Sequence, residues 1–180
     1  MLVVSLDPGE SSGGAVLRMK DSQPAELLAA HQVDGGVEGF LGLLDTLEEY
    51  RGFATWICEK YSPRPSTATG FQQSLKTTLP LVCEGVLIGR DLMPVYSPKE
   101  KRWRDPGVQY LVGGKNRADK KKRQHKFLKD SGFYRTGKDL GAPDADDFRS
   151  SASHGLAYLL RGGHTPTLNL VRDWIDINES

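Results

Sequence analysis

The stretch Leu2-Val3-Val4-Ser5-Leu6-Asp7-Pro8-Gly9 is a short apolar run that ends at a carboxylate and a Pro-Gly turn. Apolar, β-prone residues followed by such a turn predict a strand that stops at Asp7. A carboxylate between a strand and a tight turn is expected at the edge of a sheet. An aspartate in this place is commonly a turn cap, so Asp7 indicates a function only in combination with other residues.

The residues that follow predict a small antiparallel meander. Strands are expected at residues 13–19 and 25–33, and three strands joined by short turns pair in this way. A helix is expected next, because apolar residues recur at helical spacing over residues 37–47. Residues 53–58 are nearly all β-prone and end at Glu59, as expected of a strand covered on both faces.

The second half of the chain is dominated by predicted helices. Its expected elements are a helix at 66–90 interrupted by Pro80, a short strand at 93–96, a helix from about residue 116 to 129, a Gly-rich loop at 132–143 and a helix at 144–160. The whole order predicts an α/β fold, with one mixed five-stranded sheet whose first three strands are antiparallel and helices on both faces. Residues 1–163 would form this domain, and residues 164–180 a C-terminal tail that is docked or partly disordered.

Composition limits the classes of protein to which the chain can belong. Its 180 residues suffice for one domain with a sizeable core. No signal peptide and no apolar stretch of the ~20 residues needed to span a membrane are present, so a cytoplasmic protein without a membrane partner is expected. Cys58 and Cys83 lie in apolar stretches without Cys-x-x-Cys spacing, which favours reduced, buried thiols.

Four carboxylates lie at the ends of predicted elements. Asp7 and Glu59 each end a strand, while Asp144 and Asp147 share one face at the start of the last helix. Two-metal phosphodiester cleavage needs such a set, because two Mg²⁺ ions ~3.5–4 Å apart are held by hard oxygen ligands. Each carboxylate could instead be a cap or a solvated strand end, and Asp146 is best explained as a helix cap. The four in this order favour a metal-dependent nuclease.

A basic segment gives the second indication of function. The net charge is only +1, yet twelve Lys and Arg residues lie between residues 99 and 129, so one face is expected to be basic. Such residues neutralise DNA phosphates, and a solvated helix face is the alternative. Because successive helix residues are ~100° apart, one helix cannot turn three consecutive lysines toward DNA. The candidate DNA contacts in this segment are Lys115, Arg117, Lys120, Lys121 and Lys122. Of the three consecutive lysines, one or two are expected to contact DNA, Lys120 above all.

These motifs together resemble the RuvC family of Holliday junction resolvases, within the RNase H-like superfamily. Leu-Asp-Pro-Gly at 6–9, followed by Gly14, is similar to the family's opening motif. Ile-Cys-Glu at 57–59 resembles its second motif, and Pro-Asp-Ala-Asp-Asp at 143–147 resembles its closing acidic helix. The likeness runs from residue 1 to about residue 160, with spacings that fit a compact bacterial or phage member. It implies an RNase H-like fold and a Mg²⁺-dependent endonuclease that resolves Holliday junctions and related branched DNA by paired nicks.

The resemblance also implies roles for individual residues. Two Mg²⁺ ions, or Mn²⁺ in their place, would be held by Asp7, Glu59, Asp144 and Asp147. Lys120 and Arg102 match positions where the family carries basic residues near the cleaved phosphate, so Lys120 would take part in catalysis. Tyr61 matches an aromatic residue that stacks on an unpaired junction base. Lys60 and Glu10 depart from the family's usual residues, which concerns contacts with the junction rather than the metal chemistry.

The family resemblance further implies a homodimer, with one active site for each of the two symmetric strands of a junction. The helix at 66–90 is the candidate interface, because it carries more apolar positions than one sheet face needs. Another RNase H-like nuclease and a non-catalytic DNA-binding module, in which the carboxylates are caps, stay open as alternatives. An actin-like ATPase is disfavoured, because that class needs further Gly-rich phosphate loops and a longer, two-lobed chain.

Overall fold

The chain folds around a four-stranded mixed sheet. The computed structural model describes residues 1–58, 71–92, 111–142 and 144–179. Strands β1 (Leu2–Asp7), β2 (Ser11–Lys20) and β3 (Gln23–Asp34) form the predicted antiparallel meander, and β4 (Ala54–Cys58) pairs parallel to β1. The order across the sheet is β3-β2-β1-β4. The predicted strand at 93–96 lies outside the described residues, so four strands are found there and a fifth stays a prediction.

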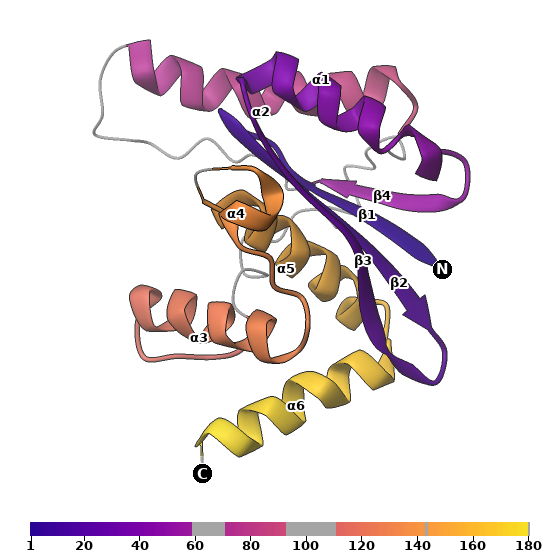
Figure 1. Cartoon of the computed structure of the whole chain (residues 1–180), viewed down its shortest axis with the longest axis vertical. Coiled ribbons are helices and arrows are strands. Elements are labelled where there is room, and N and C mark those ends of the chain that lie inside the picture. The colour runs from indigo at the N-terminus through magenta and orange to yellow at the C-terminus, as the bar shows by residue number, and fades with distance from the viewer. Residues whose placement is uncertain (59–70, 93–110, 143, 180) are drawn as a thin grey trace.

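Helices cover both faces of this sheet, as predicted (Figure 1). Helices α1 (Gly36–Thr46) and α2 (Phe71–Gly89) lie on one side, with a 3-10 turn at Glu48–Tyr50 after α1. Helix α5 (Asp146–Arg161) contacts β1 and β2 from the other side. Helices α3 (Arg117–Asp130), α4 (Gly137–Leu140) and α6 (Thr165–Glu179) complete that second layer.

Alternating residues of β1 divide the core into two layers. Val4 and Leu6 are fully buried in the cluster that includes Phe40 and Leu44 of α1. Ser5, between them, faces α5, and its hydroxyl donates a hydrogen bond to the Ser151 carbonyl oxygen at 2.7 Å. Since the side chains of a strand alternate between its two faces, Asp7 lies on the same face as Ser5. The end of β1 therefore directs a carboxylate toward the start of α5.

Several boundaries differ from the sequence prediction for identifiable reasons. Helix α5 begins at Asp146 rather than at residue 144, because the Asp144 carboxylate accepts a hydrogen bond from the Asp146 amide and makes a turn before the helix. Thr136 and Asp139 form a capping box that starts the short helix α4 inside the predicted loop. Helix α2 continues through Pro80 as a single helix.

The C-terminal residues are an integral helix of the second layer. Val171 and Trp174 of α6 are buried beside Phe127 of α3, and the Trp174 indole donates a hydrogen bond to Asp130 at 2.9 Å. Thr167 accepts a hydrogen bond from the Ala25 amide of β3 at 2.9 Å. The residues predicted as a docked or partly disordered tail thus form a helix packed on α3 and β3. Their buried positions 167, 171 and 174 follow helical spacing.

Two predictions made from composition can be compared with this fold. Cys58 and Cys83 are both buried thiols in one core cluster, as predicted, and burial raises the pKa of Cys83 to about 11. Among the described residues, none of the helices has the length and apolar character needed to cross a bilayer.

Candidate functional site

The residues that carry two of the four predicted carboxylates, Asp7 and Asp147, lie on either side of a glycine. Asp7, the last residue of β1, is paired directly with Gly13 of β2. A Cβ atom at Gly13 would lie 2.2 Å from both the carbonyl carbon and the carbonyl oxygen of Asp147. The backbone of α5 therefore touches β2 at a place that only glycine allows. Because paired residues of neighbouring strands point to the same face, Asp7 and Asp147 belong to one edge of the sheet.

The third carboxylate, Asp144, is held by an amide from β3. Gln32 is 7% exposed, and its Nε2 atom donates a hydrogen bond to Asp144 Oδ1 at 3.0 Å. The Oε1 atom of the same amide accepts a hydrogen bond from the Phe148 backbone N–H at 3.1 Å. Gln32 thus uses both ends of its amide to fix Asp144 against the first turn of α5.

The carboxyl group of Asp147 has a raised pKa. Burial is the largest cause, and the negative charges of Asp144 and Asp34 raise the pKa further. The Ser11 hydroxyl acts in the opposite sense, although it makes no well-formed hydrogen bond within the described residues. Asp34 ends β3 opposite Ser11, so this edge carries one more carboxylate than the sequence predicted. Such crowding of acidic groups is relieved when a cation binds between them.

The donor set at this edge fits a hard divalent cation. Asp7, Asp144 and Asp147 offer carboxylate oxygens, the ligands that Mg²⁺ takes in proteins. Within the described ranges, no three side chains of the His, Cys, Asp or Glu type already stand close enough to hold a metal ion. Glu59 follows the last residue of β4, which lies beside Leu6 of β1. Glu59 itself lies outside the described residues, so its part in the site stays a prediction.

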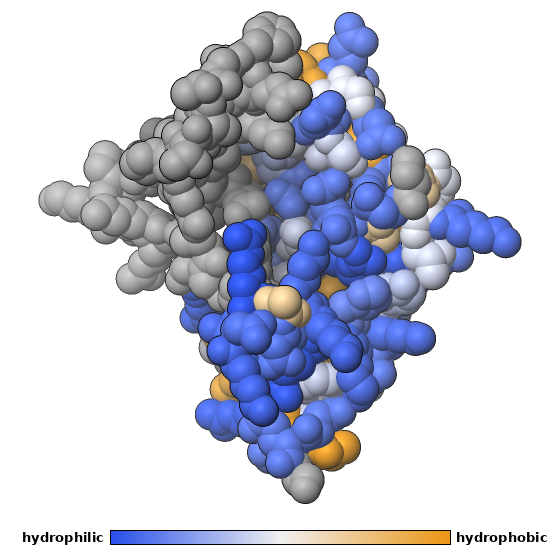
Figure 2. Space-filling model, turned by 90° about the vertical axis from the view of Figure 1, so that its left-hand side faces the viewer, coloured by the Kyte–Doolittle hydropathy of each residue, from blue (hydrophilic) through white to orange (hydrophobic). Residues whose placement is uncertain are grey.

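The basic residues predicted to bind DNA are distributed over helix α3 and its surroundings. Figure 2 shows the side of the molecule on which α3 lies, and its coloured surface is mainly hydrophilic. Arg117 and Lys121 line a pocket between α3 and α5, whereas Lys122 is exposed and does not line it. Lys115 is exposed just before α3, and Lys120 is half-buried. Tyr61 and Arg102 lie outside the described residues.

Sequence reasoning missed three residues that shape this edge: Gly13, Gln32 and Asp34. Asp34 had a usable signal, because it ends a predicted strand just before Gly35-Gly36, as Asp7 does before Pro8-Gly9. The other two had none. Their importance comes from contacts with residues more than 20 positions away in the chain, such as the Gln32–Asp144 hydrogen bond.

We expect Gln32→Leu to lower the free energy of unfolding by about 1–3 kcal/mol, because it leaves the buried Phe148 N–H without its acceptor. The change also frees Asp144, so the affinity for divalent cations should fall. Urea unfolding and calorimetric titration with Mg²⁺ measure the two effects.

Gln23→Leu is the matched control, since Gln23 is an exposed residue at the start of the same strand. It should leave both quantities within experimental error. Equal results for the two variants would mean that the Gln32 amide does not position Asp144.

The comparisons with known proteins give a fold but no close relative. No protein-family model matches the sequence, and no curated protein is similar to it. RuvC of Thermus thermophilus superposes with a TM-score of 0.52 at 19% identity, over 91% of this chain and 98% of RuvC. A fowlpox virus resolvase in complex with Holliday junction DNA gives a TM-score of 0.53 at 18% identity, over 89% of this chain and 98% of the resolvase. The fold implied by the motifs is thus confirmed: the chain has a RuvC-like fold.

Proposed function

We propose that this protein is a metal-dependent endonuclease that resolves Holliday junctions and related branched DNA by paired nicks. One observation carries the proposal: Asp7 and the Asp147 backbone meet across Gly13, in a fold like that of RuvC and the fowlpox virus resolvase. A turn cap or a helix cap would not need α5 to touch β2 at the residue paired with Asp7. The contact therefore favours a shared site over two unrelated caps.

The residues that would hold the metal are the carboxylates of this edge. Asp7, Glu59, Asp144 and Asp147 would bind two Mg²⁺ ions, or Mn²⁺ in their place. When bound, such ions supply activation of a water molecule and stabilisation of the leaving oxygen. The chain itself orients the ligands: Gln32 holds Asp144, and Gly13 lets α5 bring Asp147 to the sheet.

Basic and aromatic residues would hold the DNA. Lys120 would neutralise charge at the cleaved phosphate, and Tyr61 would stack on an unpaired base at the centre of the junction. Further phosphates would be neutralised by Arg102, Lys115, Arg117, Lys121 and Lys122.

A four-way junction assay tests the function directly. The protein should cut a synthetic junction at symmetric positions in Mg²⁺, cut a linear duplex of the same sequence far more slowly, and cut neither in EDTA. Faster cutting of an RNA–DNA hybrid would favour another RNase H-like nuclease. Tight junction binding without cleavage in Mg²⁺ or Mn²⁺ would favour a non-catalytic DNA-binding module.

We further propose that the protein acts as a homodimer through α2. Leu81 and Ile88 are seven residues apart, which places them on one face of the helix. They are 46% and 48% exposed, and neighbouring Val82 is 41% exposed. Burying two such side chains contributes roughly 1.5–3 kcal/mol each. This face of α2 is suited to pairing with its symmetry mate.

We expect Leu81→Glu and Ile88→Glu each to weaken dimerisation at least about tenfold, because a charge would be buried in an apolar interface. Light scattering at micromolar concentration should then show a monomer, and paired nicks should give way to single nicks. Ile177→Glu is the control, since Ile177 is 76% exposed on α6. A wild-type monomer that still cuts both strands symmetrically would contradict the proposal.

A further inference from the structure

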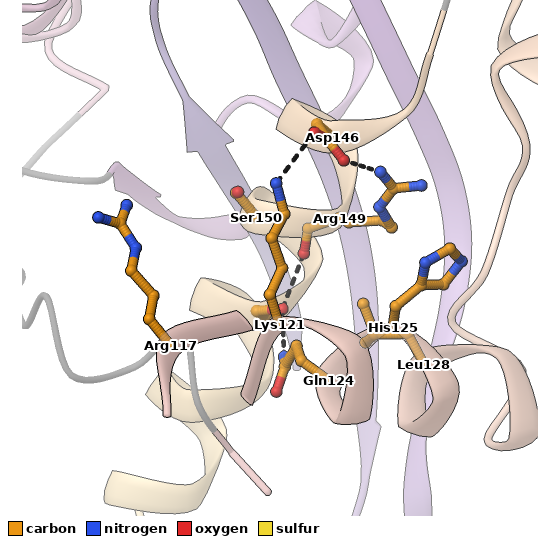
Figure 3. A pocket seen from close by; sticks show the side chains of 9 residues that line it. Arg117, Lys121, Gln124, His125, Leu128, Asp146, Arg149 and Ser150 are labelled. Atoms are coloured by element: carbon orange, nitrogen blue, oxygen red, sulfur yellow. Dashed lines mark hydrogen bonds and ion pairs between the residues drawn. The ribbon is translucent and has the colours of Figure 1, made fainter. Parts of the chain in front are cut away.

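A pocket between α3 and α5 lies beside the carboxylate edge. Its volume is about 200 Å³. Figure 3 shows Arg117, Lys121 and His125 reaching it from α3, and Arg149 and Ser150 from the first two turns of α5. Basic side chains from two helices thus line one concave site.

The charges in this pocket are incompletely balanced. Lys121 Nζ lies 3.1 Å from Asp146 Oδ2, and the Arg149 guanidinium forms an ion pair with the other oxygen of the same carboxylate. One carboxylate therefore serves two cations. With Arg117, the lining residues carry an excess of two positive charges when His125 is neutral.

His125 reports the same positive field. Its ring stacks on Tyr134, with the centroids 4.9 Å apart. Burial lowers the pKa of His125 most, and the charges of Arg149, Lys129 and Lys121 lower it further. The lowered pKa favours the neutral form of His125. The positive charge of the pocket therefore comes from its lysine and arginine side chains, and it is available to an anionic ligand.

We propose that this pocket binds a backbone phosphate of the DNA substrate through Arg149 and Lys121, with Arg117 at its rim. The proposal rests on the proposed function and names a phosphate site in it. Asp146 occupies the place of an anion between the two cations. A phosphate would replace Asp146 as their partner, because a guanidinium pairs with phosphate oxygens through two parallel hydrogen bonds. The Ser150 hydroxyl is a further donor lining the same space.

The pocket lies close enough to the carboxylates to serve the same DNA strand. Asp146 and Arg149 face α3, whereas Asp147 touches β2 at Gly13. The two sites are thus separated by no more than one helix, whose diameter with side chains is about 10–12 Å. DNA rises 3.4 Å per nucleotide along a strand, so the bound phosphate would lie within about three nucleotides of the cleaved one. Such a contact would fix the position of the strand over the carboxylates.

The test compares Arg149→Gln and Asp146→Asn with controls that change the charge equally. Arg172 and Asp173 are exposed residues of α6 that do not line the pocket, so Arg172→Gln and Asp173→Asn are the controls. Affinity for a synthetic four-way junction is measured in EDTA over a series of salt concentrations. Thermal unfolding of each variant shows that it is folded.

We expect Arg149→Gln to weaken binding about tenfold at physiological salt and to reduce the slope of log K against log salt by about 0.9. Asp146→Asn should tighten binding, because it removes the competing anion, and Arg149→Lys should restore the slope but not the full affinity. The two α6 controls should change neither quantity beyond a small general charge effect.

Two outcomes would overturn the phosphate site. If Arg149→Gln behaved like Arg172→Gln, the pocket would not contact the DNA backbone. If Asp146→Asn weakened binding as Arg149→Gln does, the ion pair would be structural. Neither result touches the function itself, which fails separately if the wild-type protein neither prefers the junction to duplex nor cuts it in Mg²⁺.

Discussion

Asp7→Asn and Asp147→Asn should each slow cleavage of a four-way junction by at least about a thousandfold. A metal ion contributes several kcal/mol to stabilising the transition state, and each 1.36 kcal/mol corresponds to about a tenfold change in rate. Asparagine has the shape of aspartate without its charge, so the metal site loses affinity while the fold is kept. Glu59→Gln and Asp144→Asn should act in the same direction. Single-turnover rates in Mg²⁺ measure the loss.

Binding separates this effect from unfolding. In EDTA, the same variants should bind the junction as tightly as the wild type or more tightly, because a negative charge near the phosphates is lost. Asp173→Asn, an exposed change on α6, should cut at the wild-type rate. Near-normal cleavage by any of the four variants would show that its carboxylate is a cap or a surface group, and that residue would be removed from the metal site.

Gly13→Ala should abolish cleavage and destabilise the fold together. The added Cβ would lie 2.2 Å from the Asp147 backbone, so α5 must move away from β2. Overfilling a packed contact costs about 1–3 kcal/mol, and here the obstacle is backbone, which cannot rotate aside. We expect a loss of at least about 2 kcal/mol in the free energy of unfolding, together with a loss of Mg²⁺ affinity as Asp147 leaves Asp7.

The same substitution at Gly42 is the control, and it should change the free energy of unfolding in the opposite direction. Gly42 lies within α1, and a Cβ there would meet nothing within 4 Å. Alanine is preferred to glycine inside a helix by about 0.8–1.0 kcal/mol, so Gly42→Ala should stabilise the protein slightly and leave cleavage unchanged. Urea unfolding and single-turnover assays on both variants make the comparison. If Gly13→Ala proved as harmless as Gly42→Ala, α5 would not depend on close contact with β2.

The order and type of the main elements could be predicted from the sequence because their signals are local. The apolar run before Asp7 predicted β1, and the two further strands with short turns between them predicted the meander of β2 and β3. Helical spacing predicted α1 and α5, and a helix was also expected at α3, with small errors at their ends. One such error arose where a side chain takes the place of a backbone acceptor: the Asp144 carboxylate accepts the hydrogen bond of the Asp146 amide just before α5. The same strand and helix ends indicated Asp7, Asp144 and Asp147 as candidates for one site.

The arrangement around those carboxylates was decided by the tertiary structure. No periodicity relates Gly13 to Asp147, Gln32 to Asp144, or Asp34 to Asp147, since each pair is joined across the chain by folding. Lys121 likewise meets Asp146, the helical neighbour of Arg149, only because α3 packs beside α5. The sequence by itself determined which carboxylates end which elements, because strand and helix signals act over neighbouring residues. Which glycine and amide lie against those carboxylates, and which lysine meets Asp146 beside them, depended on contacts between distant segments. Only the folded sheet and its helices bring those segments together.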